Sequence, residues 1–149
     1  MIGTIMLSAI ESGITGLTFG IDEEEKTNKI ERETKIIKEA YQQLQQYLNG
    51  ERKEFSLSLE PKGTEFQRRV WKALSTIPYG ETKSYKQIAE QIGSKKAYRA
   101  VGMANNQNPI SIFIPCHRVI GSNGKLVGYG GGLEIKKTLL ELEETYHFE

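Results

Sequence analysis

The chain has 149 residues, 38% of them hydrophobic, so it is long enough to bury one core or two small ones. Its single cysteine excludes an internal disulfide and a multi-cysteine zinc site, and it fits a reducing compartment. No apolar run approaches transmembrane length, and the N-terminus lacks the basic and apolar regions of a signal peptide. We therefore expect a cytoplasmic protein that has no contact with a membrane.

Charge is distributed unevenly along the chain, although the net charge is only +1. Residues 1–60 carry 7 Lys and Arg against 11 Asp and Glu, whereas residues 61–149 carry 13 against 8. Basic charge concentrated in one part of a chain favours binding to a polyanion such as nucleic acid. Many solvated protein faces share this property, so the signal is weak by itself.

The first part of the chain predicts a small α/β unit. Two β-prone runs at residues 2–9 and 14–21 are separated by a glycine-containing turn and predict a hairpin. Helical periodicity over residues 30–48 predicts an amphipathic helix, which Asn49 and Gly50 end. The strict alternation of residues 55–59 predicts a third strand. No residue pattern in this part indicates chemistry.

From residue 61 onward the pattern is mainly helical. Thr64 with Gln67, and Ser84 with Gln87, form two capping boxes, each of which predicts a helix start. The expected helices cover residues 66–77, 85–92, 96–106 and 133–144. The tight turn at residues 93–95 between the second and third of these gives the outline of a helix-turn-helix, a pattern that many simple helix corners share.

The helix at residues 96–106 is unusual because it has a face of small residues. Arg99 is its one long cation, and the small residues are Ala97, Ala100, Gly102 and Ala104. Such a helix permits close approach of its backbone to DNA, and a lone arginine could fill the space left by an extruded base. The alternative is that the alanines only pack against a neighbouring helix.

The only cysteine lies in an apolar stretch that ends in Pro115-Cys116-His117-Arg118. The run at residues 112–114 predicts a buried strand, which Pro115 terminates. An adjacent imidazole and guanidinium form an electropositive setting that lowers a thiol pKa and favours the thiolate. A buried structural cysteine is the alternative, and it is the commoner fate of a lone cysteine.

The last part of the chain predicts a hairpin, a loop and a helix. Residues 118–121 and 125–128 flank a glycine-containing turn and predict a wing. The glycine-rich residues 129–132 predict either a loop that approaches a flat ligand closely or a flexible connector. In the final helix, Glu143 lies beside an apolar face.

Residues 115–119, Pro-Cys-His-Arg-Val, resemble the active-site signature of the O6-alkylguanine-DNA alkyltransferases. Further matching segments follow in the family's order and spacing, at residues 79–85, 99–102, 108–109, 129–133 and 143. The resemblance is strong over residues 64–144 and weak before them. It implies an α/β N-terminal domain over residues 1–60, with a ribonuclease H-like small antiparallel sheet plus a helix. A mainly α winged helix-turn-helix domain over residues 61–149 follows.

The resemblance also implies catalytic roles. Cys116 would be the nucleophile and the permanent alkyl acceptor, and His117 would take the thiol proton through a water molecule. Glu143 would orient the imidazole, which completes a chain of nucleophile, base and orienting group. Asn108 would brace the turn that carries the cysteine. Tyr85 would help to rotate the damaged base out of the duplex and would donate a proton to it.

For DNA, the resemblance implies that Arg99 fills the space vacated by the flipped base. The other residues expected at the DNA are Tyr85, Lys86, Ser94, Ala97, Gln67 and Ser122. Those expected around the base are Tyr85, Cys116, Val119, Tyr129, Gly130 and Gly131. Gly130 stands where some relatives have serine, and from this change we infer a more open pocket. The implied partner is double-stranded DNA containing O6-alkylguanine, bound by a monomer without metal or organic cofactor.

The implied reaction is single-turnover repair, in which the alkyl group of O6-alkylguanine, and of O4-methylthymine, moves to Cys116. A soft thiolate suits attack at an alkyl carbon, and the thioether that forms is stable. Three other functions each fit only part of the sequence pattern. A non-enzymatic alkyltransferase-like protein would lack the cysteine, and a helix-turn-helix regulator leaves the Cys-His pair unexplained. A cysteine hydrolase needs a facing nucleophile and base, which adjacent residues rarely provide.

Overall fold

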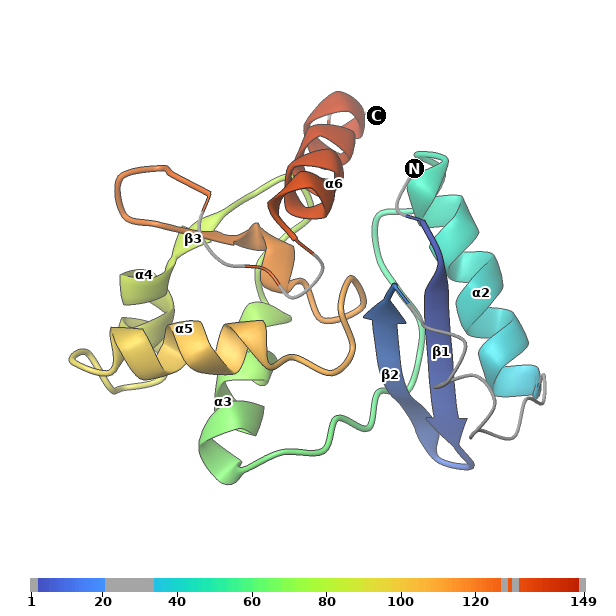
Figure 1. Cartoon of the computed structure of the whole chain (residues 1–149), viewed down its shortest axis with the longest axis horizontal. Coiled ribbons are helices and arrows are strands. Elements are labelled where there is room, and N and C mark those ends of the chain that lie inside the picture. Colours follow the sequence, from blue (N-terminus) through green and yellow to red (C-terminus); the bar gives the residue numbers. More distant parts are fainter. Residues whose placement is uncertain (1–2, 21–33, 127–128, 130–131, 148–149) are drawn as a thin grey trace.

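The computed structural model describes residues 3–20, 34–126, 129 and 132–147. A hairpin and one helix form one side of the molecule, and the helices of the second half of the chain form the other (Figure 1). Helix α6 (Leu133–Tyr146) belongs to the second half, but its C-terminal end contacts both sides. The ring of Tyr146 lies against Gly50, and that of His147 lies against Gly80.

The predicted hairpin is confirmed. Strands β1 (Ile5–Ile10) and β2 (Gly13–Phe19) pair antiparallel, with an irregularity between Ser8 and Ala9. Helix α2 (Lys35–Leu48) packs against both strands. The predicted start of this helix, at residues 30–33, lies outside the described residues.

The predicted third strand at residues 55–59 is wrong as a regular strand. Only Leu59 forms a bridge, parallel to Ile14, whose N–H donates to the carbonyl of Ser58 at 2.8 Å. The backbone of Ser56 is instead paired by a helix side chain, because its N–H donates to Gln43 Oε1 at 2.9 Å and its carbonyl accepts from Gln43 Nε2 at 3.3 Å. The alternation of apolar and polar residues correctly predicted which side chains are half-buried and which are exposed. It could not predict which group forms hydrogen bonds with the backbone of this segment.

The helix-turn-helix is present in the second half. Helices α3 (Glu65–Leu74), α4 (Tyr85–Gln91) and α5 (Tyr98–Asn106) follow one another, and both predicted capping boxes are formed at α3 and α4. Trp71 on α3 is buried and donates from its indole N–H to the carbonyl of Ala104 at 2.8 Å, which fixes α3 against α5.

The small-residue face of α5 divides between packing and solvent. Ala104 is buried against neighbouring helices, Ala97 and Gly102 are half-buried, and Ala100 is exposed. Packing therefore accounts for Ala104, and close approach of the other small residues to DNA stays a prediction.

The strand predicted at residues 112–114 is also wrong, because the chain turns there. Ile112 has a φ of 74°, in the left-handed region, and Ser111 bridges to Ile114. These apolar residues are buried because the turn enters the core, and not because they form a strand. Cys116 then begins a single 3-10 turn, η1 (Cys116–Arg118).

The predicted wing differs in its pairing. Strand β4 (Val119–Ile120) pairs parallel with β3 (Lys83–Ser84), and within the described part of the predicted arm, residues 125–126, it has no paired strand. A turn follows, in which the N–H of Gly121 donates to the carbonyl of Lys125 at 2.9 Å. Residues 127–128 of the predicted arm lie outside the described residues.

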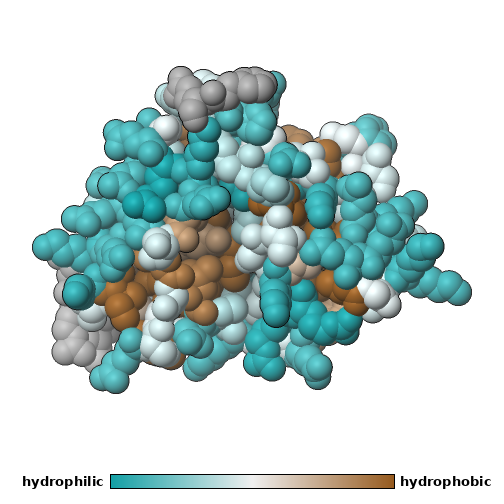
Figure 2. All heavy atoms as spheres, turned by 180° about the vertical axis from the view of Figure 1, so that it is seen from behind, coloured by the Kyte–Doolittle hydropathy of each residue, from teal (hydrophilic) through white to brown (hydrophobic). Residues whose placement is uncertain are grey.

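The surface seen from behind is largely hydrophilic and carries hydrophobic areas between polar ones (Figure 2). No helix among the described residues has both the length and the apolar character that a membrane crossing requires.

Candidate active site

Cys116 is held in a buried turn that two halves of the molecule support. From the N-terminal side, the N–H of Leu17 in β2 donates to the carbonyl of Pro109 at 2.9 Å. Asn108 braces the turn, because its Oδ1 accepts from the N–H of Ile110 and its Nδ2 donates to the carbonyl of Ile114, both at 2.9 Å. The residue predicted to brace the cysteine turn thus lies within it.

The thiol is 2% exposed, and its surroundings act on its acidity in two directions. Burial has the largest effect and raises the pKa of the Cys116 thiol, although hydrogen bonds with Asn108 and Ser111 and the charge of Lys136 work to lower it. The lowered thiol pKa expected from the sequence is therefore wrong, because the thiol lies in the core. The sequence predicted Arg118 as a cation near the thiol, but Arg118 is directed to Glu143. The nearby cation is Lys136, on α6.

His117 and Glu143 form a fully buried pair, with His117 Nε2 at 2.6 Å from Glu143 Oε2. Burial lowers the pKa of His117 against the influence of Glu143, so we take the imidazole as neutral at pH 7. An ionised carboxylate only accepts hydrogen bonds, so the proton of the neutral ring is on Nε2. Nδ1 therefore carries the lone pair, and it is buried with no hydrogen-bond partner among the described residues. This arrangement leaves Nδ1 available as a base.

Glu143 is the centre of a wider network. Arg118 binds it through both oxygens, with Nε at 2.8 Å from Oε1 and a terminal nitrogen at 3.0 Å from Oε2. The N–H of Gly80 donates to Oε1 at 3.0 Å, and the hydroxyl of Tyr47 donates to Oε2 at 2.6 Å. Burial works to raise the pKa of Glu143, but its hydrogen bonds and charge interactions with His117 and Arg118 outweigh burial and lower the pKa to about 2. The carboxylate is therefore ionised across the physiological range.

Lys136 is a buried cation that no sequence motif indicated. Its Nζ donates to the carbonyl of Val119 at 2.6 Å, and the residue is 0% exposed. Burial lowers the pKa of Lys136 to about 8, against the opposing influence of Cys116. Its spacing from Leu139 and Glu143 places it on the buried face of α6, but lysine is so rarely buried that its residue type hides this signal.

We expect Lys136→Met to raise the pH at which Cys116 reacts. Removing a cation that favours the thiolate should raise the thiol pKa by about one unit. The pH dependence of modification by a small thiol reagent, followed by intact mass, measures this shift. Lys137→Met, which removes the exposed neighbouring lysine, is the matched control. Equal pH profiles for the two variants would contradict a role of Lys136 in thiol acidity.

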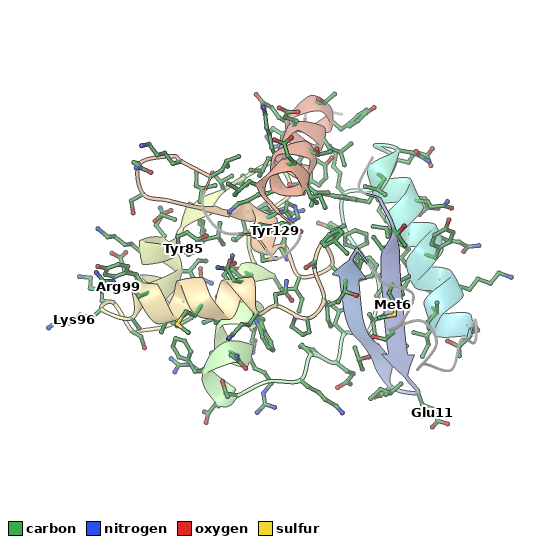
Figure 3. All side chains as sticks on the ribbon, in the orientation of Figure 1. Met6, Glu11, Tyr85, Lys96, Arg99 and Tyr129 are labelled. Atoms are coloured by element: carbon green, nitrogen blue, oxygen red, sulfur yellow. The ribbon has the colours of Figure 1, made fainter. Side chains whose placement is uncertain are left out.

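Two tyrosines lie beside the cysteine. Burial and the charge of Cys116 raise the pKa of Tyr85, and the same causes raise the pKa of Tyr129, so both hydroxyls keep their protons. The ring of Tyr85 faces the backbone of α5, where a Cβ added at Gly102 would lie 3.8 Å from it. The ring of Tyr129 contacts that of Phe19 in β2, with centroids 6.0 Å apart. Tyr85 and Tyr129 lie on the same half of the molecule, with Arg99 further out (Figure 3).

The exposed part of the helix-turn-helix carries cations around an aromatic ring. Arg99 and Lys86 are exposed, and their charged groups lie 6.0 and 5.6 Å from the ring centre of Tyr98. Ser94 and Ala97 are half-buried in the turn between α4 and α5. These residues, predicted at the DNA, lie together on α4, α5 and the turn between them.

The remaining residues predicted to contact DNA or the flipped base lie outside this cluster on α4 and α5. Gln67 completes the α3 cap and donates to Gln107 at 2.7 Å, and Ser122 is exposed in the turn after β4. Val119 is fully buried next to η1, and Gly130 and Gly131 lie outside the described residues. Among the residues that the structure describes, no group of three or more His, Cys, Asp or Glu could hold a metal ion.

Two models of one protein family cover most of the chain. Residues 65–145 match the family model "6-O-methylguanine DNA methyltransferase, DNA binding domain", and residues 1–61 match the model of the ribonuclease-like domain of the same family. A methylated-DNA–protein-cysteine methyltransferase of Methanosarcina barkeri is 54% identical over 145 residues, 96% of this chain and 92% of the relative. A protein of the same name from Mycobacterium leprae is 52% identical over 96% of this chain and 87% of its own length.

Solved structures of proteins with the same family name are similar to this chain over nearly its whole length. The O6-methylguanine methyltransferase of Mycobacterium tuberculosis superposes with a TM-score of 0.88 at 50% identity, over 97% of this chain and 88% of that one. The crystal structure of the Mycobacterium tuberculosis protein in complex with DNA superposes with a TM-score of 0.85 at 48% identity, over 97% of this chain and 89% of that one. The resemblance seen around Cys116 thus extends over nearly the whole chain, which belongs to the 6-O-methylguanine DNA methyltransferase family.

Proposed function

We propose that this chain repairs DNA by moving the alkyl group of O6-alkylguanine to Cys116, once per molecule. The observation that carries the proposal is the buried Cys116 thiol, next to a His117–Glu143 pair and beneath a helix-turn-helix. The relatives' name, methylated-DNA–protein-cysteine methyltransferase, supports the same reaction. We extend the substrate class to O4-methylthymine, which offers the same kind of alkyl–oxygen bond.

In the proposed reaction, His117 Nδ1 takes the thiol proton through a bridging water. The thiolate of Cys116 attacks the alkyl carbon, so that an S–C bond forms while the C–O6 bond breaks. The electron pair of the broken bond remains on the guanine, and a proton from Tyr85 makes the guanine a better leaving group. The imidazolium of His117 then releases its proton to water, and the tyrosinate of Tyr85 takes one up from water. In the net balance, one proton moves from the thiol to the guanine, and the thioether persists.

The proposed substrate is a base that has been flipped out of double-stranded DNA. A thiol that is 2% exposed cannot reach a base inside a duplex, so the base must come to the thiol. Arg99 lies on the exposed part of α5, where it could occupy the space the base leaves, while Lys86 contacts phosphate. Tyr85, Val119 and Tyr129 surround the position of the base.

We propose further that residues 1–60 and 61–149 are two domains of a monomer. The first domain carries the hairpin that supports the cysteine turn, and the second carries the DNA-contacting residues and the thiol. The proposed location is the cytoplasm, in association with the nucleoid when the protein is bound to DNA.

The test is to incubate the protein with a duplex containing O6-methylguanine and to measure its intact mass. We expect the mass of one methyl group to be added to the wild-type protein and none to be added to Cys116→Ala. The variant should still bind the duplex in a gel-shift assay, since the thiol is buried away from the exposed cations. A wild-type protein that binds this duplex without gaining mass would overturn the proposal.

A further inference from the structure

Tyr47 joins the N-terminal half of the chain to the candidate catalytic pair. It lies on α2, within the residues that match the ribonuclease-like domain, and its side chain is 0% exposed. Its hydroxyl donates to Glu143 Oε2 at 2.6 Å and lies 3.4 Å from His117 Nε2. The pair predicted from the second half of the chain is therefore contacted by a residue of the first half.

The same carboxylate oxygen serves Tyr47 and His117. Oε2 also accepts from Arg118 at 3.0 Å, and Oε1 accepts from Arg118 Nε and from the N–H of Gly80. An ionised carboxylate has about four lone-pair sites, so five donors saturate it. Tyr47 and His117 therefore share the electron density of one oxygen, and removing one donor strengthens the interaction with the other.

The ring of Tyr47 is fixed independently of its hydroxyl. It packs against Phe55, with ring centroids 5.3 Å apart, and edge-on against Tyr79 at 6.1 Å. Burial and the charge of Glu143 raise the pKa of Tyr47 well above its ordinary value, so the hydroxyl remains a donor throughout the working range. A change to phenylalanine thus removes the donor while it keeps the packing.

We propose that Tyr47 is a positioning residue for alkyl transfer, which sets the geometry of Glu143 and, through that carboxylate, the proton affinity of His117. The proposal rests on the function proposed above, and it makes the N-terminal domain a part of the active site. Without the phenol, Oε2 holds more charge for His117 Nε2, and the imidazolium becomes easier to form. The other charged or titratable groups around the pair are Arg118, Lys136, Cys116 and Tyr79.

The direction of the pH effect follows from the role of His117 as a base. The imidazole can take the thiol proton only in its neutral form. A higher proton affinity of His117 lowers the fraction of protein with a neutral imidazole, so the rate of transfer falls at a higher pH on the acid side of the profile. Arg118 and Lys136 oppose the imidazolium in the wild-type protein and remain in place in the variant. The loss of the Tyr47 donor is then the only change in the balance of charge and hydrogen bonds around the pair.

The experiment compares Tyr47→Phe with Tyr41→Phe in the full chain. Tyr41 lies on the same helix, is 47% exposed and accepts a hydrogen bond from Gln45 at 3.0 Å, so it is a matched loss of a phenol hydroxyl. Single-turnover transfer from free O6-benzylguanine is measured between pH 5 and pH 9, which avoids effects on DNA binding. We expect the acid midpoint of Tyr47→Phe to rise by about half a unit or more and that of Tyr41→Phe to match the wild type.

A Tyr47→Phe profile that superposes on that of the wild type would overturn the proposal, even if the rate or the melting temperature falls. A purely structural role would lower these quantities without moving the midpoint. If the wild-type protein transfers no alkyl group, the proposed function fails, and the His117 titration followed by NMR still decides the role of Tyr47. In that measurement, an unchanged His117 midpoint in Tyr47→Phe overturns the proposal, and a raised one supports it.

Discussion

Glu143→Gln is expected to slow alkyl transfer by about 10²–10⁴-fold, the range typical of losing an oriented general base. The amide of glutamine can donate as well as accept, so it no longer forces the proton of His117 onto Nε2. It also removes the negative charge that faces Arg118, whose side chain is 8% exposed. Single-turnover transfer measured by intact mass gives the rate for each protein.

The same substitution should lower the free energy of unfolding by about 3 kcal/mol at pH 7, because it leaves a buried guanidinium without its counter-charge. The pKa of Glu143 is lowered from 4.5 to about 2 in the folded protein, so its contribution to stability is complete above pH 4.5 and is lost as the pH falls through 2. The difference between wild type and variant should therefore shrink between pH 5 and pH 2. Urea unfolding at several pH values measures it.

Glu144→Gln serves as the control, because this neighbour on α6 is exposed. It should change neither the rate of transfer nor the stability beyond about 0.5 kcal/mol. Equal effects of the two substitutions would show that the Glu143 network does not organise the site.

Local sequence signals predicted much of the fold correctly. The two capping boxes placed the starts of α3 and α4, since each box is satisfied by residues three positions apart. The hairpin also follows from local β propensity and a turn. Cys116, His117 and Glu143 were found through a resemblance of motif and spacing, and the 2.6 Å contact between His117 and Glu143 shows why both belong to one site.

Interactions that depend on long-range packing were not predictable in this way. Tyr47 and Glu143 are 96 positions apart, and nothing in the α2 pattern distinguishes a core tyrosine from one that donates to a catalytic carboxylate. Lys136 shares a helix face with Leu139 and Glu143, but a lysine is ordinarily assigned to solvent, whereas the structure buries it near the thiol. The extended chain at residues 55–59 failed as a strand because Gln43 pairs its backbone, and no local pattern shows such a partner.

The exposed position of Arg99 leads to a separate prediction about alkyl transfer from duplex DNA. Arg99 is exposed, and its guanidinium lies 6.0 Å from the ring centre of Tyr98. Flipping a base costs a few kcal/mol of stacking and pairing, and a side chain inserted into the gap recovers part of this. The benefit applies only to a duplex, because a free base needs no extrusion.

We therefore expect Arg99→Ala to slow transfer from an O6-methylguanine duplex by about 10²-fold or more, while transfer from free O6-benzylguanine changes less than about twofold. Lys96→Ala removes an exposed cation just before α5 and provides the control (Figure 3). It should weaken duplex binding in a salt-dependent manner and leave the rate at saturating duplex unchanged, as expected when one phosphate contact is lost. Rates are measured by single-turnover mass spectrometry with each substrate at saturation. An Arg99→Ala protein that loses both activities equally, or that behaves like Lys96→Ala, would show that Arg99 acts through the fold or through phosphate binding and not by replacing the flipped base.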